Sequence, residues 1–322
     1  MQFFFAGPIP VIRNFLFSRM PLPLSLFLFL LGIALMYGLL WLAVPRGSLL
    51  HELLHLPPFW VHLLSSPGNN FREERIAYGA HRRQYMLLCI PPEGMPLQPA
   101  VLFYFHGGGW QFGAPEQFRP QAQQLTRRGF VVLLPSCRRL PRYNYRHIRE
   151  DLTQMLLKAR DVLAQREMGE KKAIIGGMSA GGNMAALAAL DHEGLEQAGL
   201  SPEWFQGLFL LGAPLHLDKM ASSPTLRFFA GPRDRPMFRQ ASPYQYLNKS
   251  VNISTLIIHG AKDGMVKFEG AREFANRMKA VNAAETRFVS LPEGTHLDVA
   301  SWFFREGEAR EAFWGWLERL SG

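Results

Sequence analysis

Residues 177–181 carry the clearest chemical pattern in the sequence, Gly-Met-Ser-Ala-Gly, with Ser179 at its centre. A serine hydroxyl becomes a strong nucleophile when a base removes its proton, and a sharp strand-to-helix turn holds the hydroxyl where a base can reach it. Such a turn crowds the backbone, so glycine is favoured on either side. The apolar run before Ser179 and the Ala-rich run after it predict that strand and that helix. Ser179 is therefore the candidate nucleophile.

A second motif, His-Gly-Gly-Gly-Trp at residues 106–110, follows an almost wholly apolar run. Acyl transfer places negative charge on the former carbonyl oxygen, and the N–H groups of a glycine-rich turn can approach that oxygen without obstruction. We expect the donors to be Gly107 or Gly108, joined by the N–H of Ala180. The alternative is a plain glycine turn at a strand end, which the order of the two motifs disfavours.

The base and its acidic partner should follow later strands at the same edge of the sheet. Asp263 follows the apolar run 254–260, and His296 follows the run 285–292. The order Ser, Asp, His is typical of strand–Ser–helix hydrolases, in which the acid fixes the tautomer of the histidine. Competing acids, each less well placed, are Asp218, Asp234 and Asp298.

Residues 51–55 match the HExxH pattern, in which two histidines bind zinc and the glutamate activates water. The candidate metal residues would be His51, Glu52 and His55. Pro57 and Pro58 should end any helix there, and no third ligand is evident nearby. A membrane-tethered zinc protease is therefore an alternative with little support.

From residue 71 onward, short apolar or β-branched runs alternate with longer helical patterns, which indicates an α/β fold with a mostly parallel sheet covered by helices on both faces. Expected strands lie within 83–92, 100–105, 130–135, 172–177, 205–214, 254–260 and 285–292, and the clearest helices within 116–129, 148–169, 268–282 and 308–320. Residues 215–248, which lack a clear period, could form a small cap.

With these motifs, residues 71–322 resemble the α/β-hydrolase carboxylesterases and lipases that carry HGGGW and GxSAGG, similar to hormone-sensitive-lipase-like and kynurenine-formamidase-like enzymes. The resemblance implies hydrolysis of carboxylic esters through an acyl-enzyme, without metal or cofactor. Met178 stands where one branch of that group often has an acidic residue, so the branch stays open. Two further hypotheses are an acyltransferase with the same triad and a non-catalytic binding module of the hydrolase fold.

Between Arg19 and Arg46 there is no charged residue, and residues 23–45 are apolar almost throughout. A helix over this stretch would span a bilayer, which predicts a single transmembrane anchor after a flank of residues 1–22. Residues 46–70 indicate a juxtamembrane amphipathic segment. Arg13 and Arg19 before the span, against Arg46 and Glu52 after it, favour a catalytic domain on the non-cytoplasmic side.

The composition of the chain bears on its partners, its disulfides and its substrate. The chain has 322 residues and a formal charge of +9, but the basic residues are scattered, so we expect no nucleic-acid partner. Only Cys89 and Cys137 are present, which excludes a disulfide framework. The apolar juxtamembrane segment and the stretch around Phe228 and Phe229 suggest a lipophilic acyl or aryl ester as the small-molecule substrate.

Overall fold

The computed structural model describes residues 24–65 and 70–321. The predicted flank 1–22, Pro23, residues 66–69 of the juxtamembrane segment and Gly322 lie outside the described residues. The chain divides into two units, one ending at Ala43 and the other beginning at Val44.

In the first unit, helix α1 (Leu24–Ala43) runs for 20 residues without a charged side chain. At 1.5 Å per residue it is about 30 Å long, close to the thickness of a hydrocarbon core. It is long and apolar enough to cross a membrane, as a signal sequence near an N-terminus also is. Helix α1 is thus a candidate anchor or signal sequence.

The second unit contains an eight-stranded sheet in the order β1-β2-β4-β3-β5-β6-β7-β8. The pairs β1–β2 and β2–β4 are antiparallel, and the other pairs are parallel. The strands are β1 (Arg72–Ala77), β2 (Tyr85–Ile90), β3 (Ala100–Phe105), β4 (Val131–Ser136), β5 (Lys172–Met178), β6 (Phe205–Leu211), β7 (Ser254–Gly260) and β8 (Thr286–Leu291). The predicted α/β fold with a mostly parallel sheet is confirmed.

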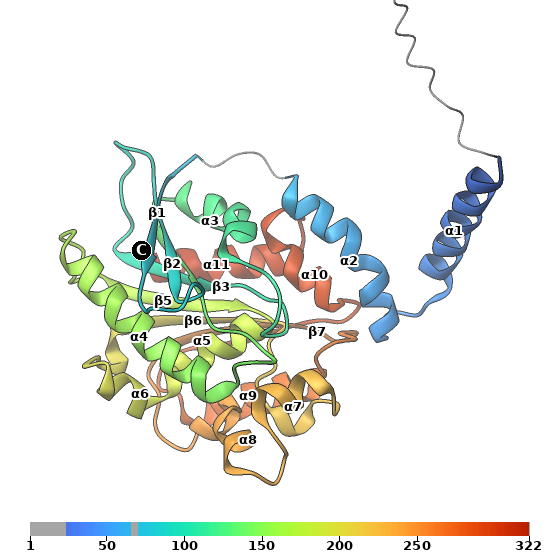
Figure 1. Ribbon diagram of the computed structural model, residues 1–322. Helices are drawn as coiled ribbons and strands as arrows, with labels where there is room; N and C mark the ends of the chain where they lie inside the picture. Colours follow the sequence, from blue (N-terminus) through green and yellow to red (C-terminus); the bar gives the residue numbers. More distant parts are fainter. Residues whose placement is uncertain (1–23, 66–69, 322) are drawn as a thin grey trace, which may run out of the picture. The chain divides into compact units, whose positions relative to one another are not determined.

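Helices join most of the strands and cover both faces of the sheet (Figure 1). They are α2 (Leu49–Leu64), α3 (Arg119–Thr126), α4 (Tyr145–Ala164), α5 (Ala180–Leu190), α6 (His192–Gln197), α7 (Pro224–Ala230), α8 (Pro236–Gln240), α9 (Phe268–Val281), α10 (His296–Ala300) and α11 (Glu308–Ser321). Short 3₁₀ turns are η1 (Pro115–Phe118), η2 (Pro202–Trp204), η3 (Leu217–Lys219), η4 (Pro243–Tyr246) and η5 (Ser301–Phe303).

Successive side chains of a strand point to opposite faces, and the central strand β3 is buried on both. Val101, Phe103 and Phe105 belong to one core cluster, and Leu102 and Tyr104 belong to the other. Burial on both faces explains why this strand reads as an unbroken apolar run. Such a strand is a rigid support for the glycine-rich turn that follows it.

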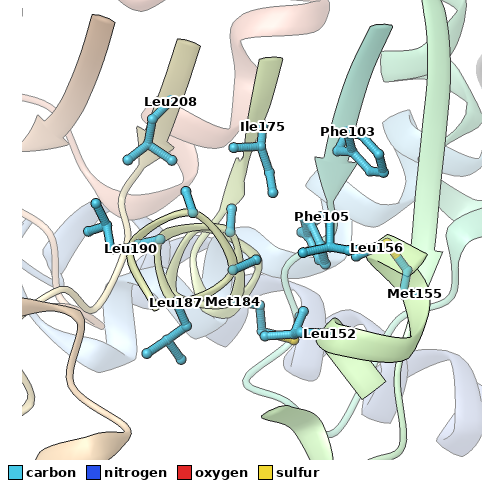
Figure 2. Packing of buried hydrophobic residues seen from close by; sticks show 14 of the residues in the cluster. Phe103, Phe105, Leu152, Met155, Leu156, Ile175, Met184, Leu187, Leu190 and Leu208 are labelled. Atoms are coloured by element: carbon cyan, nitrogen blue, oxygen red, sulfur yellow. The ribbon is translucent and has the colours of Figure 1, made fainter. Parts of the chain in front are cut away.

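The first core cluster fills the space between the sheet and helices α4 and α5. Figure 2 shows Leu152 and Met155 of α4 and Met184 and Leu187 of α5 packed against strand residues such as Ile175. Every residue of α5 is buried, and the small side chains of its sequence let the helix lie close to the sheet. This packing fixes the start of α5, directly after Ser179.

Helix α2 continues through Pro57 and Pro58, so the prediction that these prolines end the helix is wrong. Proline lacks an N–H and removes a helical hydrogen bond, which favours a break. Here the second half of the helix is held by tertiary packing. Leu63 is buried, and the ring of Trp60 meets that of Phe118 edge to face at 6.1 Å.

Candidate active site

Ser179 lies in the tight turn between β5 and α5 with φ = 55°, a conformation that side-chain-bearing residues rarely adopt. Its N–H donates to the carbonyl of Leu211 at 2.8 Å. A Cβ atom on Gly177 would come within 2.3 Å of the Phe105 carbonyl oxygen, and one on Gly181 within 2.2 Å of the same atom. Glycine at both positions therefore lets the serine turn approach the end of β3.

Asp263 and His296 are brought together by the turns after β7 and β8. Nδ1 of His296 lies 2.7 Å from Oδ2 of Asp263, and both side chains are buried. The other carboxylate oxygen of Asp263 accepts from the N–H groups of Met265 at 2.8 Å and Val266 at 2.7 Å. With Oδ1 held in this way, Oδ2 is fixed toward the imidazole.

The electrostatics of this pair favour the ionised forms of both groups. Burial alone raises the pKa of Asp263, but the charge and hydrogen bond of His296 and the nearby His259 hold that pKa below its usual value. Burial lowers the pKa of His296, but the charge and hydrogen bond of Asp263, with a contribution from Glu52, bring it above its ordinary value. The arrangement stabilises an imidazolium next to a carboxylate.

The glycine-rich turn after β3 lies against the serine turn. A Cβ atom on Gly107 would be 3.5 Å from the Cβ of Ser179. Gly108 has φ = 122°, and a Cβ atom there would lie 2.4 Å from the Phe112 carbonyl oxygen. The N–H of Ala180, at the first position of α5, has no carbonyl acceptor within its own helix. Gly107, Gly108 and Ala180 all border the same cavity as Ser179.

His106 stabilises the glycine-rich turn. Its Nδ1 lies 2.7 Å from the Gly107 carbonyl oxygen, so this nitrogen carries the proton and donates. Its ring stacks on Phe118 with centroids 5.2 Å apart. Burial lowers the pKa of His106 to about 4, so the ring is neutral near pH 7.

A cavity of about 770 Å³ connects the residues named by the two motifs. Ser179 and His296 both line it, and its other walls are largely apolar. Helix α2 supplies Leu49, Leu53, Leu56, Phe59 and Trp60. Other elements supply Phe112, Phe118, Met220, Leu226 and Leu297. Its size is in the range of small-molecule sites in proteins.

The residues of the HExxH sequence form hydrogen bonds with the backbone and do not form a zinc site. Nδ1 of His51 faces the Val44 carbonyl oxygen at 3.4 Å, and Nδ1 of His55 faces that of His51 at 2.8 Å. Across residues 24–65 and 70–321, no three His, Cys, Asp or Glu side chains gather in a way that could hold a metal ion. Oε1 of Glu52 instead accepts from the N–H groups of His296 and Gly264. Sequence reasoning missed this contact.

The competing acids lie elsewhere. Asp218 is 3.6 Å from His216, Asp234 pairs with the adjacent Arg235, and Asp298 binds Arg305 at 2.7 Å.

Phe228 and Phe229 lie outside the set of residues that line the cavity, contrary to the expected lipophilic contribution of this stretch. Phe229 is buried in a stack on Trp110, and Phe228 is exposed.

The sheet order, the strand–Ser–helix turn and the acid and base at the same edge define the α/β-hydrolase class. The chain belongs to the α/β-hydrolase fold family, whose sequence profile matches residues 102–297. The resemblance inferred from the sequence is thereby confirmed.

Curated relatives are esterases of bacteria and plants. Esterase LipC of Mycobacterium tuberculosis is 27% identical over 248 residues, covering 69% of this chain and 59% of the relative. The isoprenylcysteine alpha-carbonyl methylesterase of Arabidopsis thaliana is 22% identical over 279 residues, covering 81% of this chain and 65% of that protein. The chain thus spans somewhat less than two thirds of the length of these relatives.

Solved structures share the fold. Esterase B of Lactobacillus rhamnosis superposes with a TM-score of 0.68 at 18% identity, covering 84% of this chain and 91% of that one. An esterase of Thermogutta terrifontis bound to propionate gives a TM-score of 0.59 at 24% identity, covering 77% and 91% of the two chains. At these identities the likeness establishes the fold alone.

Proposed function

We propose that this protein is a serine hydrolase of carboxylic esters, with Ser179 as nucleophile, His296 as base and Asp263 as the partner of the base. The observation that carries this proposal is the 2.7 Å contact between Nδ1 of His296 and Oδ2 of Asp263 at a cavity that Ser179 also lines. Ser179 is partly exposed there, whereas both of its neighbours are buried.

The first half of the reaction forms an acyl-enzyme. Nε2 of His296 takes the hydroxyl proton as the Oγ of Ser179 attacks the carbonyl carbon of the ester. The oxygen that becomes negative accepts hydrogen bonds from the N–H of Ala180 and from Gly107 or Gly108. The tetrahedral intermediate then collapses, and His296 gives its proton to the departing alcohol.

The second half repeats these steps with water. His296 takes a proton from water, the resulting hydroxide attacks the acyl carbon, and Ser179 leaves with the proton returned by the imidazole. Asp263 accepts from Nδ1–H throughout, so that Nε2 stays free to receive a proton. Apart from the ester and water, each step uses only side chains and backbone groups of this chain, so the proposed reaction needs no metal or cofactor.

The names of the relatives support hydrolysis of esters over acyl transfer. Two mycobacterial relatives are esterases, and two plant relatives are methylesterases of isoprenylcysteine. The last two names describe methyl esters of a cysteine that carries an isoprenyl group, which is apolar. A cavity whose walls are largely apolar, with several leucine and aromatic side chains, fits a substrate of that general kind.

We therefore propose a lipophilic ester as the substrate. On p-nitrophenyl esters with two to sixteen carbons, kcat/KM is expected to rise by about tenfold or more from acetyl to octanoyl, since each buried methylene contributes about 0.8 kcal/mol. Steady-state kinetics over the series measures this. A sharp preference for acetyl would contradict the proposed substrate class.

Two leucines of α2 provide a matched comparison for the chain-length series. Leu53 and Leu50 are both 49% exposed, but only Leu53 lines the cavity. Leu53→Gln is expected to reduce kcat/KM for the octanoyl ester severalfold with little change for acetyl. Leu50→Gln should leave the chain-length profile unchanged. Equal effects of the two substitutions would show that α2 does not contact the acyl chain.

We also propose that α1 anchors the enzyme to a membrane, with the hydrolase unit on the non-cytoplasmic side. The length and apolar composition of α1 support an anchor. The proposed side rests on the basic residues before the span. An anchored enzyme would meet lipophilic esters at the membrane surface, where such molecules concentrate.

A further inference from the structure

A buried carboxylate that the reaction steps above do not use lies directly beside the proposed base. Glu52 of α2 is fully buried. Its Oε1 accepts from the N–H of His296 at 2.7 Å and from the N–H of Gly264 at 3.1 Å. One oxygen atom therefore binds the residue proposed as base and the residue that follows Asp263.

The contact joins parts of the chain that are far apart in sequence. Glu52 precedes His296 by 244 positions and Gly264 by 212. The two residues follow different strands, β8 and β7, and their loops must keep a fixed separation for the 2.7 Å contact between His296 and Asp263. A single acceptor bound to both loops constrains that separation.

Neighbouring residues reinforce this bridge. Nη1 of Arg46 donates to the Glu293 carbonyl at 3.0 Å, on the loop that leads to His296. The Ser48 carbonyl oxygen lies only 2.4 Å from where a Cβ on Gly264 would be, so the start of α2 presses on the other loop. The segment before α2 thus packs on both loops, and Glu52 is its buried polar contact.

The burial of the Glu52 carboxylate is unfavourable in free energy, which suggests that Glu52 has a role beyond packing. Oε2 of Glu52 is buried and has no hydrogen-bond partner within the described part of the chain. A buried carboxylate with an unsatisfied oxygen is unfavourable unless another interaction offsets the lost hydration. An imidazolium at His296, formed in every turnover of the proposed reaction, would supply that interaction.

We propose that Glu52 is a positioning residue for the proposed ester hydrolysis, holding the loops of His296 and Asp263 together and stabilising the protonated form of His296. This inference rests on the proposed function. It makes α2 part of the active site, in addition to its place in the cavity wall. It also explains the glutamate of the HExxH sequence without a metal.

Several titratable or charged groups lie near His296, and those that face it affect its pKa. Asp263 faces it from the loop after β7, and Glu52 faces it from α2. His259 of β7 lies 3.4 Å from Oδ2 of Asp263. On α10, the helix of His296, the carboxylate of Asp298 accepts from the N–H of Thr295 and pairs with Arg305. Lys267 borders the same cavity as His296.

The sign of the expected shift follows from the role of the base. His296 must be neutral to take the proton of Ser179, so activity is lost as pH falls through the pKa of His296. The negative charge of Glu52 contributes to raising that pKa. Glu52→Gln removes the charge and keeps an oxygen acceptor, so the acidic limb of kcat/KM should move to lower pH.

The test compares E52Q, E52A and E203Q with the wild-type full chain, by the pH dependence of kcat/KM and by the rate of labelling with a fluorophosphonate. E52Q should shift the acidic limb and keep most of its labelling rate at neutral pH. E52A, which loses the acceptor as well, should label about 10²-fold more slowly. Glu203 is an exposed carboxylate of η2, before β6 and away from both loops, so E203Q should leave both measurements unchanged.

The outcomes separate this inference from the proposed function. If the wild-type protein is not labelled at Ser179, the proposed function fails. If it is labelled but E52Q has the acidic limb of the wild type, or E203Q shifts the limb equally, only the role of Glu52 is overturned. A structural role alone would lower the melting temperature of E52Q without moving its pH profile. Should E52A fail to fold, the E52Q profile still decides.

Discussion

Replacing Ser179 by alanine is expected to lower kcat for ester hydrolysis by about 10⁵-fold or more, because no other group in the proposed site can form the acyl-enzyme. The backbone N–H groups of Gly107, Gly108 and Ala180 stay in place, so a small residual rate over water should remain. Steady-state hydrolysis of p-nitrophenyl butyrate by purified protein measures the loss.

A control for this substitution comes from the opposite edge of the sheet. Ser201 is an exposed serine that caps the turn η2, just before β6 begins. Ser201→Ala should keep activity within about twofold, as surface changes away from a site usually do. Residual activity of S179A above a few per cent, after exclusion of contaminating esterase, would contradict the assignment of the nucleophile.

Replacing Asp263 by asparagine is expected to lower kcat by about 10⁴-fold. The oxygen of the new amide would stay with the N–H groups of Met265 and Val266, which now bind Oδ1. Its NH₂ group would then face Nδ1 of His296 and favour the tautomer with the proton on Nε2. That tautomer cannot accept the proton of Ser179. The measurement is kcat with the same ester.

The matched control for Asp263 is Asp298, an acid only two positions after His296. Asp298 accepts from the N–H of Thr295 at 3.0 Å and pairs with Arg305. Asp298→Asn weakens a helix cap, which is worth about 1 kcal/mol, and should change kcat by less than about tenfold. If D298N proved as inactive as D263N, or D263N kept a tenth of the wild-type rate, the roles of the two acids would have to be revised.

Much of the fold could be predicted because its elements have strong local patterns. Strand β3 is an unbroken apolar run, and β5 leads directly into the Ala-rich helix α5. Strand β1 was not predicted because its sequence, Arg-Glu-Glu-Arg-Ile-Ala, is mostly charged and lies half exposed at the sheet edge. Its pairing with β2 is visible only in three dimensions.

The proposed triad could be located for a similar reason. Each of Ser179, Asp263 and His296 follows an apolar run, and the carboxyl ends of parallel strands meet at one edge of the sheet. The contact of Glu52 could not be found in this way, because its partners are backbone N–H groups that have no sequence signature. The HExxH pattern is typical of zinc sites and so did not predict this contact. The two prolines predicted a helix shorter than α2.

The walls of the cavity were the least predictable part of the site. The sequence pointed to the juxtamembrane segment and to Phe228 and Phe229. Helix α2 of that segment does supply part of the apolar lining, whereas Phe229 packs on Trp110 in the core. Which aromatic side chain faces a cavity depends on how separate elements pack, and local sequence does not encode that. The lining is therefore a property of the tertiary structure.

The central claim, that Ser179 is a nucleophile activated by His296, is tested most directly by labelling the wild-type protein with a fluorophosphonate and mapping the adduct by mass spectrometry. The reagent forms a bond between phosphorus and the serine oxygen with loss of fluoride, and it reacts with activated serines. The account predicts a single adduct, on Ser179, that is absent in S179A and forms far more slowly in His296→Ala. A folded wild-type protein that stays unlabelled, or an adduct on another residue, would contradict it.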